Sequence, residues 1–187
     1  MQSSPDGYEY HQLRASTMTA KLLRSLAGVS IAVASLSCVA PCFAADPEGA
    51  KPSKAQLDRG RYLVRIGGCN DCHTPGYGEA NGNVPESAWL TGVPLGWKGP
   101  WGTTYASNLR TYFRSMKANE WVKAAKALKA RPPMPWFTVN AMTEPDLRAM
   151  YAYVYSLGPA GGPVPDYVPP GVTPSGPFVS FPEPPKK

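Results

Sequence analysis

Two cysteines and a histidine, close together in the chain, are the residues with the clearest chemical potential. They lie in the run Cys69-Asn70-Asp71-Cys72-His73, which has the pattern C-x-x-C-H. Thiols three residues apart lie on the same side of a helical turn. They can bond to two vinyl groups on one porphyrin edge, while the adjacent imidazole binds the iron. The motif therefore predicts one covalently attached c-type haem, with His73 as an axial iron ligand.

Two other classes of protein use closely spaced cysteines. A thioredoxin-like motif would follow a strand at the start of a helix, within a βαβ pattern, and the sequence does not alternate in that way. A structural zinc site needs about four ligands, whereas the expected mature chain offers two thiols and one imidazole. Haem attachment is therefore the preferred interpretation.

The N-terminal region has the features of an export signal. Lys21 and Arg24 precede an apolar run at 26–39, which is short for a membrane-spanning helix. The segment 42–44 has small residues at the two positions that a signal peptidase reads. We expect cleavage after Ala44 and a periplasmic location. An uncleaved anchor, which would hold the protein at the membrane, is the alternative.

The true start of the chain and the removal of the signal decide which cysteines and histidines the mature protein contains. Residues 1–17 precede Met18, so either the first residue or Met18 is the true start. Cleavage would leave Cys69 and Cys72 as the only thiols, which excludes a separate disulfide within one mature chain. His73 would be the only histidine, which excludes ligation of the iron by two histidines from this chain.

The charge of the chain is mildly basic. After Ala44 there are 16 basic and 11 acidic residues, a net charge of +5. This excess is too modest, and too poor in basic runs, to indicate nucleic-acid binding. The basic segment 110–131 holds seven basic residues and one acid. We interpret it as a solvated helical face; the alternative is a docking surface that steers an acidic redox partner toward the haem edge.

Helical patterns occupy three stretches. Ser53 and Gln56 resemble a capping box at the start of the first helix. Gly60, in the middle of that helix, costs about 1 kcal/mol relative to Ala, so we expect another helix to cross closely there. The stretch 109–130 is expected to be helical in its second half, and 143–156 has the strongest start and stop signals.

The remaining segments are rich in Gly and Pro. Residues 74–108 are expected to be irregular, with aromatic side chains packed on the porphyrin; a mobile surface loop is the alternative. The last thirty residues hold ten Pro and five Gly, so they form neither helix nor central strand. They lie across the body or form a flexible tether. We predict an all-α haem domain at 45–159, with long loops around the haem, between a signal region at 1–44 and a tail at 160–187.

A methionine is the best candidate for the second axial ligand. The four after Ala44 are Met116, Met134, Met142 and Met150. Prolines around Met134 forbid a helix and hold its thioether on a rigid, extended segment. Met142 is explained by a hydrophobic staple with Leu147, Met150 by core packing, and Met116 has no rigid flank. We predict Met134 as the ligand; Met142 and an open sixth position are the alternatives.

Histidine–methionine ligation indicates a function. A thioether favours ferrous iron and raises the reduction potential, and an iron with both axial positions filled has no place for a substrate. We therefore expect a single-electron carrier that is not an enzyme and takes no small-molecule substrate. The first alternative is a haem enzyme or gas or redox sensor with an open or labile sixth position. The second is a docking subunit whose haem is incidental.

Several segments are also characteristic of a family. They are Gly60 to Leu63, Cys69 to Thr74, Met134-Pro135-Trp136 and Asp146 to Tyr153. Through them the chain resembles monohaem class I cytochromes c over most of residues 53–159. Residues 102–108 are similar to haem domains of periplasmic dehydrogenase-associated cytochromes. The resemblance implies a cytochrome c-like fold, in which the first and last helices cross beside the haem near Gly60. After Asn108, Leu109-Arg110-Thr111 replaces the acidic, glycine-rich turn usual in those subunits, which often carry several haem motifs.

Overall fold

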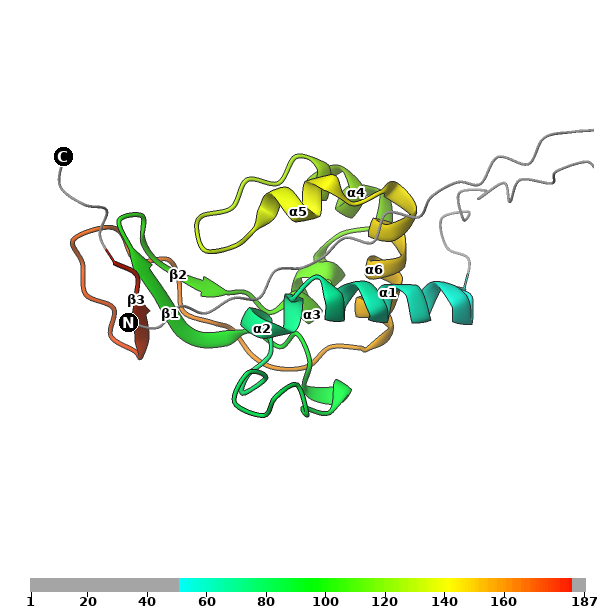
Figure 1. Cartoon of the computed structure of the whole chain (residues 1–187). Coiled ribbons are helices and arrows are strands. Elements are labelled where there is room, and N and C mark those ends of the chain that lie inside the picture. Colours follow the sequence, from blue (N-terminus) through cyan, green and yellow to red (C-terminus); the bar gives the residue numbers. More distant parts are fainter. Residues whose placement is uncertain (1–50, 183–187) are drawn as a thin grey trace, which may run out of the picture. The chain divides into compact units, whose positions relative to one another are not determined.

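The computed structural model describes residues 51–182 (Figure 1). The predicted export signal, its cleavage after Ala44 and the choice of start all lie outside the described residues. These expectations therefore stay predictions. Between residues 51 and 182, no helix is long and apolar enough to cross a membrane.

Two thirteen-residue helices, α1 (Lys54–Ile66) and α6 (Glu144–Ser156), pack across each other (Figure 1). Each is capped by the residue that the sequence predicted as its cap, Ser53 for α1 and Thr143 for α6. The hydroxyl groups of Ser53 and Thr143 accept hydrogen bonds from the backbone N–H three residues further on, at 3.1 and 3.3 Å. These caps satisfy N–H groups that have no partner within the helix.

The crossing of α1 and α6 depends on Gly60. A β-carbon at this position would collide with the carbonyl oxygen of Ala149 and would lie 2.6 Å from the β-carbon of Tyr153. Only a glycine lets the two backbones approach so closely. The close helix contact predicted at Gly60 is thus confirmed.

Shorter helices lie between these two. They are α2 (Cys69–His73), α3 (Leu109–Tyr112), α4 (Ala118–Lys126) and α5 (Trp136–Ala141), with 3₁₀ turns η1 (Glu86–Ala88) and η2 (Phe113–Ser115). The predicted helix in the second half of 109–130 corresponds to α4. The proline-rich run around Met134 comprises residues 131–137. It is non-helical as far as Pro135, whereas Trp136 and Phe137 already belong to α5.

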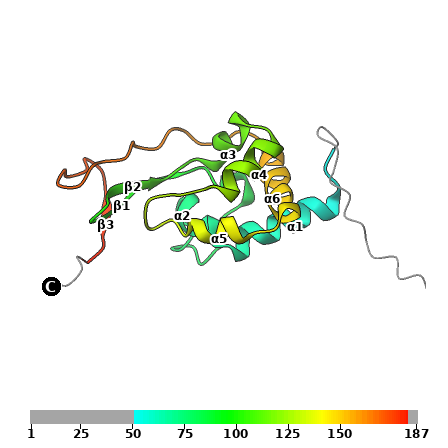
Figure 2. The same ribbon diagram turned by 90° about the horizontal axis from the view of Figure 1, so that it is seen from above.

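A small sheet means that the domain is not purely α-helical, contrary to the sequence prediction. Strands β1 (Val93–Gly99) and β2 (Gly102–Ala106) form an antiparallel hairpin within the segment expected to be irregular. Strand β3 (Phe178–Ser180) pairs in parallel with β1, giving the order β2-β1-β3 (Figure 2). The aromatic and β-branched residues of the hairpin suit strands, but glycines and a proline within β1 weaken the sequence signal.

The described part of the tail lies against the body of the domain. Val168 and Thr103 exchange backbone N–H···O hydrogen bonds of 2.8 and 3.0 Å. Further along, β3 occupies an edge of the sheet. Of the two arrangements expected for the tail, the one in which it lies across the body holds as far as residue 182, and no central strand is formed there.

The apolar core lies among α1, α4 and α6, together with η2 and the segment after α2. The aromatic rings of Phe113 and Trp121 pack with centroids 4.4 Å apart. Trp89, from the segment expected to pack on the porphyrin, is 3% exposed and belongs to this core. Its Nε1–H donates to the Val84 carbonyl at 2.7 Å. Of the aromatic residues in 74–108, Trp89 is thus buried and packs mainly against protein, while Tyr77, Trp97, Trp101 and Tyr105 are half-buried.

Candidate functional site

The cysteine motif forms a separate helical turn directly after α1. Gly68 has φ +66°, a left-handed conformation that glycine adopts without strain. Gly68 turns the chain between the two helices and is the N-cap of α2. Cys69 and Cys72 therefore lie on one short helix. Cys69 and Cys72 are not joined to each other by a disulfide.

One large cavity brings together the predicted site residues. Cys69, Cys72, His73 and Met134 all line a cavity of about 1020 Å³, at the upper end of the usual size for small-molecule sites. Its walls come from α2, the β1–β2 hairpin, α5, the α4–α5 loop (residues 127–135) and the tail. Figure 1 shows α2 on one side and the α4–α5 loop on the other.

His73 is buried and oriented by a backbone carbonyl. Its Nδ1 lies 2.7 Å from the carbonyl oxygen of Ser107, just after β2. Because a carbonyl can only accept, Nδ1 carries the proton and Nε2 keeps its lone pair for a metal. Burial lowers the pKa of His73, and the Ser107 hydrogen bond opposes that shift. A neutral imidazole is the form that binds iron.

The two thiols do not have the properties of a redox-active cysteine pair. Burial raises the pKa of Cys69 to about 11, with a smaller effect of Asp71. The pKa of Cys72 is also raised, by burial and then by Asp71. Neither thiol is therefore a ready thiolate at neutral pH, unlike the reactive cysteine of a thioredoxin-like site. Within residues 51–182 no cluster of three His, Cys, Asp or Glu side chains could hold a metal ion.

The methionine candidates differ in their relation to the cavity. Met134, Met142 and Met150 line it, whereas Met116 does not; the Met116 carbonyl accepts from the Tyr151 hydroxyl at 2.8 Å. Met150 is 4% exposed and packs within the core on α6. Met134 comes from the α4–α5 loop, on the wall opposite α2. The geometry thus brings Met134 and His73 to one cavity and leaves Met142 as the competing ligand.

Polar groups at the cavity wall suit a ligand with acidic substituents. The indole Nε1–H of Trp97 is buried and has no hydrogen-bond partner among the described residues. An unpaired buried donor costs about 1–3 kcal/mol, so an acceptor on a bound group would stabilise it. Lys129 and Arg131 also line the cavity. A flat, largely apolar porphyrin with carboxylate side chains fits these features.

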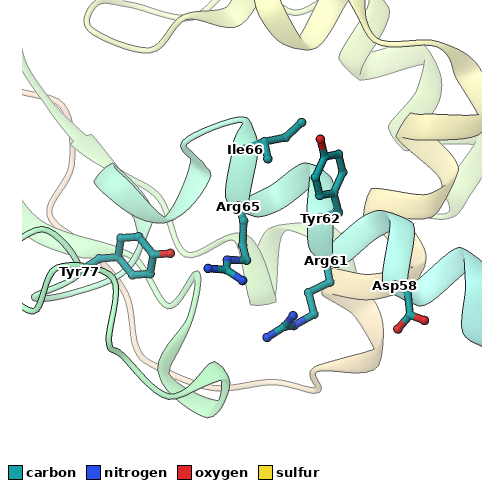
Figure 3. A pocket seen from close by; sticks show the side chains of 6 residues that line it. All are labelled: Asp58, Arg61, Tyr62, Arg65, Ile66 and Tyr77. Carbon is teal, nitrogen blue, oxygen red and sulfur yellow. The ribbon is translucent and has the colours of Figure 1, made fainter.

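A second hollow lies on the outer side of α1 and is smaller. It has a volume of about 480 Å³ and is lined by Asp58, Arg61, Tyr62, Arg65, Ile66 and Tyr77. Figure 3 shows that Tyr62 and Ile66 point away from Arg61 and Arg65. Arg61 is paired with Glu86. These side chains do not converge on one point, so this hollow is not a candidate site.

The basic segment 110–131 is not a uniform solvated face. Arg110 is 3% exposed and donates to four backbone carbonyls, those of Ser87, Trp89, Leu157 and Gly158. No pattern in the sequence indicated this buried role, because arginine is rarely buried. Other basic side chains of the segment also contact the protein, as Arg131 does through the ring of Tyr167. The area that can attract an acidic partner is smaller than the residue count suggested.

The chain is similar to known proteins over much of its length. The family model described as Cytochrome c matches residues 57–158. A nicotinate dehydrogenase subunit of Pseudomonas putida is 29% identical over 118 residues, which cover 57% of this chain and 9% of the relative. The fructose dehydrogenase cytochrome subunit of Gluconobacter japonicus is 25% identical over 167 residues, covering 83% of this chain and 30% of the relative. The chain thus spans less than a third of either relative. No solved structure gives a significant match.

Proposed function

Because the chain belongs to the cytochrome c family, whose members bind haem covalently and transfer electrons, we propose that it is a single-electron carrier with one c-type haem. Cys69 and Cys72 attach the haem through thioether bonds, and His73 and Met134 are the axial ligands. The observation that carries this proposal is that the C-x-x-C-H turn and Met134, distant in sequence, line the same cavity.

Each residue of the proposed haem site has a separate role. Cys69 and Cys72 fix the position of the porphyrin, while the Ser107 carbonyl keeps Nε2 of His73 available to the metal. Met134 supplies a soft thioether from the opposite wall. The bound haem supplies the one-electron change between ferric and ferrous iron, at a potential that the thioether raises. With both axial positions filled by the protein, no substrate binds the iron.

Export and electron transfer with dehydrogenases complete the proposal. The signal features at residues 21–44 support a periplasmic protein cleaved near Ala44. Both relatives are named as subunits of dehydrogenases, and one of them as a cytochrome subunit. These names support redox partner proteins, among them a dehydrogenase that passes electrons to this chain. An acidic partner surface would suit the basic side chains that remain exposed in 110–131.

A labile sixth position is the second candidate. The observation in its favour is that Met134 lies in a loop without regular structure, while Met142 borders the same cavity. A protein whose methionine dissociates readily could act as a haem enzyme or as a gas or redox sensor. The remaining alternative is a docking subunit whose haem is incidental. Reduction and reoxidation of the haem by periplasmic donors and acceptors on a physiological timescale would rule it out.

The absorption spectrum of the ferric protein distinguishes these functions. The carrier is expected to show a methionine-to-iron charge-transfer band that persists in Met142→Ala and disappears in Met134→Ala. The matched variant Met142→Ala controls for the loss of one methionine beside the cavity. Loss of the band in Met142→Ala alone would make Met142 the ligand. High-spin iron in the wild type, with ready binding of carbon monoxide, would support the sensor or enzyme.

A further inference from the structure

The C-terminal tail makes contacts that the cytochrome c family match does not include, because the match ends at residue 158. The tail is anchored where it leaves α6. The side-chain amide of Asn108 donates to the carbonyls of Ala160 and Gly162, at 2.8 and 3.3 Å. A β-carbon at Gly161 would lie 2.7 Å from the β-carbon of Thr91. The first residues of the tail are therefore closely packed against the body.

Tyr167 holds the middle of the tail on the β1–β2 turn. Its hydroxyl donates to the Trp101 carbonyl at 2.8 Å, and the next residue, Val168, pairs with Thr103. A β-carbon on Gly102 would lie 2.9 Å from Cε2 of Tyr167, so the ring rests directly on the turn. Beyond it, the rings of Phe181 and Trp101 pack with centroids 5.3 Å apart. The Tyr167 ring, which is 36% exposed, is thus held against the β1–β2 turn.

The same ring contacts the loop that carries Met134. The guanidinium carbon of Arg131 lies 3.8 Å from the centre of the Tyr167 ring, a cation–π contact. The adjacent Pro132 carbonyl accepts from the Thr104 hydroxyl at 2.8 Å. The tip of the α4–α5 loop is therefore joined to the hairpin and to the tail. The two helices that flank the loop are joined by a hydrogen bond of 2.5 Å from the side-chain amide of Asn140 on α5 to the carbonyl of Ala125 on α4.

We propose that the tail, through the contact of Tyr167 with Arg131, holds the α4–α5 loop closed and so keeps the Met134 thioether on the iron. This inference rests on the proposed function, in which Met134 is the sixth ligand. A thioether binds iron weakly, and this loop has neither helix nor strand to restrain it. Each contact that favours the closed loop lowers the population of the open loop, and methionine is displaced from the iron only when the loop is open. Tyr167 is a positioning residue that acts through Arg131.

The rate at which imidazole displaces methionine from the ferric protein measures this opening. Imidazole is suitable because its neutral form does not respond to the charge of Arg131. In Tyr167→Leu we expect displacement to be about two- to fivefold faster, the factor that a surface cation–π contact supplies. Tyr167→Phe keeps the ring against Arg131 and loses only the hydrogen bond to the Trp101 carbonyl, so its displacement should be accelerated less than that of Tyr167→Leu. Arg131→Gln should accelerate displacement less in the Tyr167→Leu background than in wild type, because the two residues share one contact.

A second cation–π pair supplies a matched control. The Arg114 guanidinium lies 4.4 Å from the ring of Tyr155, which is 44% exposed and does not border the cavity. Tyr155→Leu should leave the displacement rate unchanged. Equal rates for wild type and Tyr167→Leu, or equal acceleration by Tyr155→Leu, would overturn the role of the tail and leave the carrier function intact. A wild type without the methionine band would overturn the carrier function first, and this inference with it.

Discussion

Replacing Arg110 by methionine should destabilise the protein strongly. The guanidinium is buried, and its bonds include one of 2.5 Å to the Gly158 carbonyl and one to the Leu157 carbonyl, at the C-terminal end of α6. Both bonds place a positive charge at the negative end of a helix. The other two, to Trp89 and Ser87 at 3.3 and 3.4 Å, join the segment before the hairpin.

The size of the effect follows from these bonds. A hydrogen bond from a charged group contributes about 1.5–3 kcal/mol, and a cation at a partly buried helix end contributes up to about 2 kcal/mol. Arg110→Met removes them but also removes the cost of burying a charge, so we expect a net loss of about 2–4 kcal/mol. With a urea m-value of about 1–3 kcal/mol/M, the midpoint should fall by about 0.7–4 M.

Urea unfolding of the haem-loaded protein, followed by circular dichroism, measures this loss. Arg114→Met is the control, because Arg114 is exposed and donates one bond of 2.9 Å, to the Tyr155 carbonyl. We expect it to lower the free energy of unfolding by less than about 1 kcal/mol. A change below about 0.5 kcal/mol in Arg110→Met, or equal losses in both variants, would refute the assigned role of Arg110.

Three further predictions concern the helix crossing, pH and the attachment. Gly60→Ala should destabilise the protein by about 1–3 kcal/mol, despite better helix propensity; a rise in thermal midpoint would contradict it. The Arg59 side-chain hydrogen bond lowers the pKa of Asp146. The stabilisation from this ionised carboxyl is therefore present above the pKa of Asp146 in the unfolded chain and lost as pH falls through its pKa in the folded protein. Asp146→Asn should unfold more easily than wild type at pH 7 and equally at low pH. Cys72→Ser should retain haem through one thioether, visible as a shift of the pyridine haemochrome band; an unshifted band would contradict attachment there.

Local signals in the sequence were sufficient for the long helices and for the haem motif. The hydroxyl caps at Ser53 and Thr143 act within one turn, so no knowledge of the rest of the fold was needed. Gly60 was also informative, because an otherwise unfavourable glycine in a helix implies a close neighbour. The C-x-x-C-H spacing is specific for the same reason: all of its chemistry lies within one turn.

Long-range contacts explain what the sequence did not predict. Strand β1 is interrupted by glycine and proline, and its pairing with β3 joins segments about eighty residues apart, so no local pattern revealed the sheet. The burial of Arg110 depends on carbonyls from two distant segments. The Ser107 carbonyl that orients His73 is a backbone group, which carries no sequence signal. Three methionines at one cavity likewise left the choice of ligand to experiment.

Every function proposed for this chain depends on one covalent haem bound to Cys69 and Cys72. The mass of the full-length protein tests this attachment, after expression in a host that matures c-type cytochromes, purification from the periplasm and denaturation. We expect a cleaved chain whose mass is increased by one haem that organic extraction does not remove. A colourless protein, or one whose haem is lost on extraction, would contradict the attachment.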